Sequence, residues 1–146
     1  MRIDPKSVKI KGSLSAIYGM RGFEYLDNGD LNQTIADWEM SLQYDPKNAE
    51  TKNNLAKVYN NRGVNYYESG DLNRAIDDWK TALKYDPKDA EAKNNLAVAY
   101  SKRGIEYYNS GDTKRARTDL ETALKYKPDD AAIKNNLEII KKQQGR

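Results

Sequence analysis

The chain has 146 residues, of which 32% are charged, and its formal net charge is +3. That length suffices for one compact domain or a short repeat array, and so slight a charge, with acids interspersed among the bases, argues against a nucleic-acid partner. The absence of cysteine and histidine removes disulfides, thiol chemistry and the commonest general base. With no run of 18 apolar residues, no membrane association is expected. We expect a soluble protein, with the cytoplasm favoured and the compartment otherwise unknown.

Four sequence landmarks return every 41 residues along the chain. They are Arg-Gly at 21, 62 and 103, Gly-Asp at 29, 70 and 111, proline at 46, 87 and 128, and Asn-Asn-Leu at 53, 94 and 135. A fixed period of this size indicates stacked supersecondary units, each of which buries its apolar face only against its neighbours.

Apolar residues at spacings of three and four predict seven helices, alternately long and short. Long helices are expected at 6–28, 47–69 and 88–110, short ones at 31–44, 72–85 and 113–126, and a last one at 129–144. In the middle unit, Gly70 allows the left-handed turn that ends one helix, and Asp71 can cap the next. Pro87 ends the short helix and is expected to begin the following long one.

These units resemble the tetratricopeptide repeat over essentially the whole chain. The small, aromatic and proline positions of that family's helical hairpin are filled, in order, by Gly63, Tyr66, Ala75, Trp79, Ala82 and Pro87. The family's usual period is 34 residues. The seven additional residues lie in the long helix, where the segment 53–59 is followed by the similar segment 60–66. Seven residues are close to two turns, so they lengthen the helix by about 10 Å and keep the same face inward.

The resemblance implies an all-α fold, a right-handed superhelical solenoid of antiparallel helix hairpins. We expect a single domain over residues 1–146. Its units are expected at 6–46, 47–87 and 88–128, followed by a C-terminal capping helix at 129–144. Lys141 and Lys142 make the outer side of that last helix polar, as the end of a solenoid requires. The first helix has no comparable cap.

The sequence offers no constellation of catalytic groups. Its carboxylates, lysines and hydroxyls are scattered at repeat positions, and the adjacent Asp77 and Asp78 diverge on a helix instead of forming a pair. No glycine-rich phosphate loop is present. We therefore expect no enzymatic activity, no cofactor and no metal site.

An arginine of each long helix recurs in step with an aspartate of the facing short helix. The pairs are Arg21 with Asp37, Arg62 with Asp78, and Arg103 with Asp119. The favoured interpretation is a structural ion pair that bridges each hairpin while the arginine stem packs against it. The alternative is an anion site that would take a ligand carboxylate.

Three glycines, Gly22, Gly63 and Gly104, lie inside the long helices. Glycine in a helix interior costs about 1 kcal/mol relative to alanine, and close packing between helices is the usual compensation. On the family's pattern we expect Gly63 to meet Ala75.

In the tetratricopeptide repeat family, the first helices of the hairpins line a concave face where partner peptides bind. Helical spacing along these helices gives a candidate peptide-binding set: Phe23, Leu26, Asn53, Lys57, Val64, Tyr67, Asn94, Val98, Ile105, Tyr108 and Asn135. The asparagines would form a polar edge that bonds a peptide backbone, and the apolar residues of the added turns would hold side chains. The alternative is that the added turns only pack against the neighbouring helix. The family's clamp for C-terminal carboxylates is not expected, because Asn53 and Asn94 stand where lysine would be needed.

The favoured function is therefore a non-catalytic scaffold that binds a protein or peptide through its concave face, without nucleic acid or membrane as a partner. The main alternative is structural self-association into a dimer or higher oligomer, by end-to-end stacking or hairpin swapping. It rests on the uncapped N-terminal end, where Ile10, Leu14 and Ile17 lack the short helix that would normally cover them.

Overall fold

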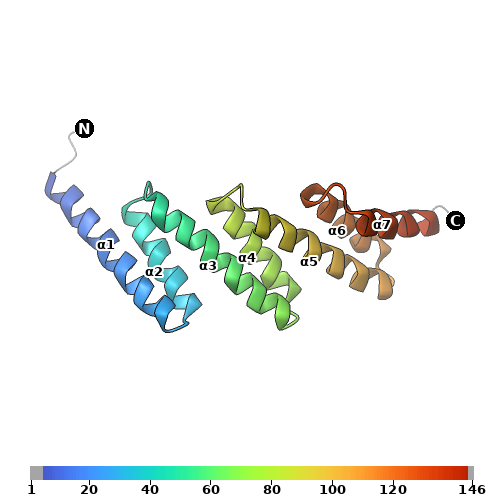
Figure 1. Cartoon of the computed structure of the whole chain (residues 1–146), viewed down its shortest axis with the longest axis horizontal. Helices are drawn as coiled ribbons and strands as arrows, with labels where there is room; N and C mark the ends of the chain where they lie inside the picture. Colours follow the sequence, from blue (N-terminus) through green and yellow to red (C-terminus); the bar gives the residue numbers. More distant parts are fainter. Residues whose placement is uncertain (1–4, 145–146) are drawn as a thin grey trace.

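The computed structural model describes residues 5–144, and within that range every regular element is an α-helix (Figure 1). The seven helices are α1 (Pro5–Asp27), α2 (Leu31–Tyr44), α3 (Ala49–Glu68), α4 (Leu72–Tyr85), α5 (Ala90–Asn109), α6 (Thr113–Tyr126) and α7 (Ala131–Gln144). Figure 1 shows them following one another in chain order from one end of an elongated molecule to the other. The expected all-α solenoid is confirmed.

The helices pack first as hairpins and then hairpin on hairpin. Helix α1 packs on α2, α3 on α4 and α5 on α6, while α2–α3, α4–α5 and α6–α7 form the junctions between units. Odd-numbered helices also touch one another directly, α3 with α5 and α5 with α7. These three helices thus share one side of the array, which is called the odd-helix face below.

The turns inside the hairpins follow from the Gly-Asp pairs. Gly70 has a φ of +86°, a conformation that side chains with a Cβ rarely adopt. The carboxylate of Asp71 then accepts a hydrogen bond from the Arg74 amide at 3.0 Å and so caps α4. The same local chemistry gives all three short helices the bounds predicted from the sequence.

The starts of the inner long helices differ from the prediction. Helices α3 and α5 begin at Ala49 and Ala90, two residues later than expected. The side chain of Asn48 accepts the Thr51 amide, and that of Asp89 accepts the Ala92 amide, so these residues are the caps. The expectation that Pro87 begins the long helix is therefore wrong, since Pro87 lies in the turn before the cap.

The core runs through the whole array as one apolar cluster. Leu55 and Leu96 are fully buried at equivalent places in α3 and α5. Trp79 packs across its hairpin and donates from Nε1 to the Asn60 carbonyl oxygen at 3.1 Å. A Cβ on Gly63 would lie 2.7 Å from that indole nitrogen. The indole of Trp79, not Ala75, is therefore the group that requires glycine at position 63.

Candidate functional site

The recurring arginines are held in bidentate ion pairs. Arg62 donates from Nε and Nη2 to the carboxylate of Asp78 at 2.7 and 2.8 Å, and Arg103 does the same to Asp119. The hydrogen bonds to these carboxylates raise the pKa of both guanidinium groups above its ordinary value, although burial opposes the shift. Such a geometry suits a structural pair that spans the hairpin.

A third hydrogen bond joins each inner arginine to the preceding hairpin. Arg62 Nη1 donates to Asn32 Oδ1 at 2.8 Å, and Arg103 Nη1 donates to Asn73 Oδ1 at 2.6 Å. Each of the three nitrogens of these guanidinium groups thus donates one hydrogen bond within the array. Arg21 forms the same bidentate pair with Asp37 at 2.6 Å, but no asparagine reaches it within residues 5–144.

The apolar residues of the predicted peptide-binding set divide into two groups. Leu26, Val64, Tyr67 and Tyr108 are partly buried and pack against the core. The other three are more open: Phe23, Val98 and Ile105 are 44%, 42% and 40% exposed. Phe23 lies edge-on to Trp38 at the N-terminal end, with ring centroids 5.1 Å apart.

The predicted polar edge consists of side chains that face solvent. Asn53, Asn94 and Asn135 are exposed at equivalent places in α3, α5 and α7, and Lys57 is exposed one turn beyond Asn53. None of the three asparagine side chains has a hydrogen-bond partner in the described part of the chain. Their amide groups are therefore available to a ligand.

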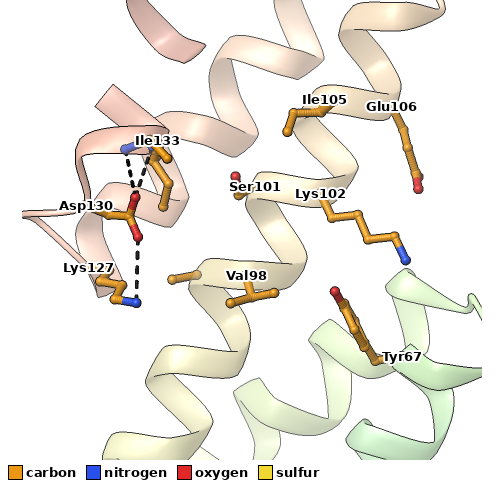
Figure 2. Close-up of a pocket in the computed structure, with 11 residues that line it drawn as sticks. Tyr67, Val98, Ser101, Lys102, Ile105, Glu106, Lys127, Asp130 and Ile133 are labelled. Atoms are coloured by element: carbon orange, nitrogen blue, oxygen red, sulfur yellow. Dashed lines mark hydrogen bonds and ion pairs between the residues drawn. The ribbon is translucent and has the colours of Figure 1, made fainter. Parts of the chain in front are cut away.

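A cavity of about 370 Å³ opens between α5 and α7, with Tyr67 of α3 at its border (Figure 2). It is lined by Tyr67, Ala97, Val98, Ser101, Lys102, Ile105, Glu106, Lys127, Asp130, Ala132 and Ile133. Figure 2 shows Val98, Ser101 and Ile105 following one another along α5, with Ile133 of α7 on one side and Tyr67 on the other. The periodic sequence pattern thus brings three predicted residues, Tyr67, Val98 and Ile105, to one cavity.

Two smaller cavities extend this space in both directions along the odd-helix face. One of about 180 Å³ lies between α3 and α5 and shares Tyr67 and Val98 with the first. The other, about 210 Å³, lies between α5 and α7 and shares Ile105. The three cavities together are called the apolar groove below. Predicted residues Val64 and Tyr108 line its two ends.

Several groove residues were not predicted from the sequence. Lys102 and Ile133 line the main cavity, and Ile139 lines the cavity beside Tyr108. Ile139 follows Val98 by one period, so the repeat could have identified it. No such signal marks Lys127 or Asp130, because the turn between α6 and α7 brings them to the groove.

The charges at the groove are unevenly neutralised. Lys127 pairs with Asp130 at 3.6 Å, and Asp130 also accepts the amides of Ala132 and Ile133 at the start of α7. Lys102 lies over the ring of Tyr67, with Nζ 4.7 Å from the centroid. Lys102 is exposed and forms no ion pair within residues 5–144, and the same is true of Glu106 at the cavity border.

Residues 5–144 contain no group of three acidic side chains that could hold a metal ion. None of the described helices is both long enough and apolar enough to cross a membrane.

The repeat sequence matches two family models. One, described as a TPR repeat, matches residues 63–104, and the other, described as a tetratricopeptide repeat, matches residues 97–130. Residues 63–130 are thus matched as tetratricopeptide repeats. No curated protein sequence matches it.

Solved structures similar to the chain include MamA protein and two that are described as TPR domains. MamA protein is 24% identical, with 92% of this chain and 84% of that chain covered and a TM-score of 0.38. The Arabidopsis OM64 TPR domain is 18% identical, with 90% and 98% covered and a TM-score of 0.37. The first TPR of Spaghetti, bound to an HSP90 peptide, is 19% identical, with 92% and 98% covered and a TM-score of 0.33.

Proposed function

We propose that this tetratricopeptide repeat protein is a non-catalytic scaffold that binds a segment of another protein in the apolar groove. The observation that carries the proposal is the placement of Val98 and Ile105, which are 42% and 40% exposed at the border of a 370 Å³ cavity. Apolar side chains gathered around a concave space with a few polar groups are typical of a binding site.

The ligand is an extended peptide. Asn94 lies one helical turn before Val98, and its amide can donate to and accept from a peptide backbone. An extended backbone has unpaired amides and carbonyls to meet it, whereas the backbone groups of a helix are already bonded within the helix. An apolar side chain of such a peptide would then enter the cavity between Val98 and Ile133.

The cavity lining has two lysines and two acids, but Lys102 itself can favour an acidic residue beside that apolar side chain. Lys102 stands at the cavity without an ion-pair partner in the described residues, while Lys127 is already paired with Asp130. A carboxylate near Lys102 would gain a charge-assisted contact next to the face of Tyr67. Because this contact is exposed to solvent, it should weaken as salt concentration rises.

A random peptide library selected on the immobilised chain tests the proposal. The expected binders share a large apolar residue with an acidic residue nearby, and Val98→Lys should weaken them at least about tenfold. The fold already carries a lysine at this position one repeat earlier, as Lys57, so the variant should remain folded. Binders that are indifferent to Val98→Lys, or a library that yields no shared pattern, would refute the groove as the site.

Self-association is a second candidate function, because α1 exposes an apolar face. Ile10 and Ile17 are 60% and 56% exposed. End-to-end stacking on α7 is disfavoured, since Glu138 and Lys141 make the outward side of α7 polar and exposed. A pairing of two α1 helices is the arrangement that would satisfy the apolar residues. Light scattering over a concentration range tests it, and a monomer at every concentration would exclude it.

A further inference from the structure

The exposed face of α1 has two covered counterparts within the same molecule. Leu14 precedes Leu55 of α3 by one period and Leu96 of α5 by two periods, and both of these later leucines are fully buried. Helix α2 packs against α3 and helix α4 against α5. The molecule therefore shows, twice, what kind of element covers a surface of the α1 type.

The covering helices share a stripe of four residues that faces the next unit. Helix α2 supplies Asn32, which bonds Arg62, and Glu39, whose Oε1 accepts the Tyr59 hydroxyl at 2.7 Å. Ile35 and Leu42 lie on the same helical stripe, and Ile35 is buried. Helix α4 repeats three of these residues as Asn73, Ile76 and Leu83, and it has Lys80 in the place of the glutamate, so the glutamate requirement comes from α2 alone.

Helix α1 has the arginine and tyrosine that contact a covering helix in the later units, but no covering helix contacts them in the described chain. Arg21 is 50% exposed, against 21% for Arg62 and 20% for Arg103, because no covering helix reaches it in the described chain. Tyr18 stacks on Tyr44 with centroids 5.8 Å apart, as Tyr59 stacks on Tyr85 at 6.0 Å. The acceptor for a third arginine bond and the apolar cover are the missing parts.

We infer that α1 is a docking site for one amphipathic helix that is supplied from outside residues 5–144. That helix carries an asparagine for Arg21, an isoleucine three residues later, a glutamate for Tyr18 after seven residues and a leucine after ten. Its apolar residues cover Ile10, Leu14 and Ile17, as the matching residues of α2 and α4 cover the next long helix.

A second copy of this chain does not meet these requirements. In the described range each short helix is already covered by the odd-numbered helix that follows it, so a folded copy has no such helix to offer. Two α1 helices placed face to face would bury apolar surface. They would supply no acceptor side chain of the required kind, because residues 6–23 contain no aspartate, glutamate, asparagine or glutamine.

The chain's own sequence provides the probe. A labelled synthetic peptide of residues 29–46 contains the α2 stripe with its caps, and its binding to the full chain can be followed by fluorescence anisotropy. The expected result is saturable binding that Ile17→Glu in the chain abolishes. Because Ile17 is 56% exposed, that variant should melt as the wild type does. In the peptide, Asn32→Ala should weaken binding about fivefold to tenfold.

A matched control peptide spans residues 111–128. It has the same length and the same helix caps, but it carries Lys114 and Arg117 where the other short helices have asparagine and isoleucine, and it should not bind. Equal binding of both peptides, no binding of either, or binding that Ile17→Glu leaves unchanged would overturn the inference. A dimer dispersed by Ile17→Glu would also overturn it, by making a second copy the occupant. Val98→Lys should have no effect here, so failure at α1 is distinguishable from failure of the groove.

Discussion

Arg62 and Asn32, thirty residues apart, are joined across the junction between two hairpins by a 2.8 Å hydrogen bond from Nη1 to Oδ1. The same guanidinium donates from Nε and Nη2, at its other edge, to the carboxylate of Asp78. One side chain therefore fixes both the pairing of helices within its own hairpin and the contact with the preceding hairpin. Arg103 repeats the arrangement, so the arginine at this repeat position links successive units of the array.

This link predicts a graded response to mutation. Asp78→Ala should lower the free energy of unfolding by about 2–3 kcal/mol, because it leaves a mostly buried guanidinium without its counter-charge. Asn32→Ala should cost about 1 kcal/mol, the value of one hydrogen bond. Urea unfolding followed by circular dichroism measures both. Asp77→Ala is the control, since that carboxylate is 78% exposed and should change stability by no more than about 0.5 kcal/mol. If Asp78→Ala lowered the free energy of unfolding no more than Asp77→Ala does, the link would not stabilise the fold.

The contact between Gly63 and Trp79 predicts that two glycine-to-alanine changes act in opposite directions. Gly63→Ala should destabilise the protein by about 1–3 kcal/mol, because the new Cβ would lie 2.7 Å from a buried indole. Gly12→Ala should stabilise it by up to about 1 kcal/mol, since nothing lies within 4 Å of the new Cβ and alanine favours the helix. Thermal melts of the two variants distinguish packing from intrinsic propensity. A stabilised Gly63→Ala would show that the tryptophan can move aside.

The fold was largely predictable because its signals are local and repeated. Gly70 and Asp71 determine where α4 begins, and Pro87 determines where it must have ended. The starts of the long helices were less predictable, since the sequence allows α5 to begin either at Pro87 or after Asp89 as its N-cap. Only the formed hydrogen bond from the Ala92 amide to Asp89 shows which of them is the cap.

The candidate site was predictable only in part. Periodicity places Val64 and Ile105 at the same position in successive units, yet Val64 packs against the core and Ile105 is 40% exposed. That difference depends on which neighbouring side chains cover each residue, a property of three packed helices together. The turn that brings Lys127 to the groove was likewise beyond a pattern read along single helices.

The division between packed and exposed apolar residues leads to a stability prediction. Val64→Ser should lower the free energy of unfolding by about 1–2 kcal/mol, because it removes a side chain that packs on the core. Ile105→Ser should cost less than about 1 kcal/mol, since much of that side chain faces the groove. Chemical denaturation of both variants compares them directly. A larger loss for Ile105→Ser would mean that this residue belongs to the core.

The helix caps predict a pH dependence. The Arg74 amide and then the Arg74 side chain hold the pKa of Asp71 below its ordinary value of 3.8, and Arg115 does the same to Asp112. Because the folded pKa lies below the unfolded one, this stabilisation is present above pH 3.8 and is lost as the pH falls through the folded pKa.

Replacing both aspartates by asparagine tests that dependence. Asparagine still accepts the capping hydrogen bond but does not titrate. The double variant should therefore lose less stability than the wild type when urea midpoints are compared at about pH 5 and about pH 2.5. Parallel pH curves for the two proteins would show that the caps contribute nothing to acid unfolding.

The most direct test of the apolar groove is methyl NMR of the full chain with valine and isoleucine labelled, titrated with a library-selected peptide. The predicted result is a set of shift changes concentrated at Val98, Ile105 and Ile133, with Ile10 and Ile17 of α1 unchanged. These changes should disappear in Val98→Lys at an unaltered melting temperature. Shift changes confined to Ile10 and Ile17, with the groove methyls unmoved, would contradict the account.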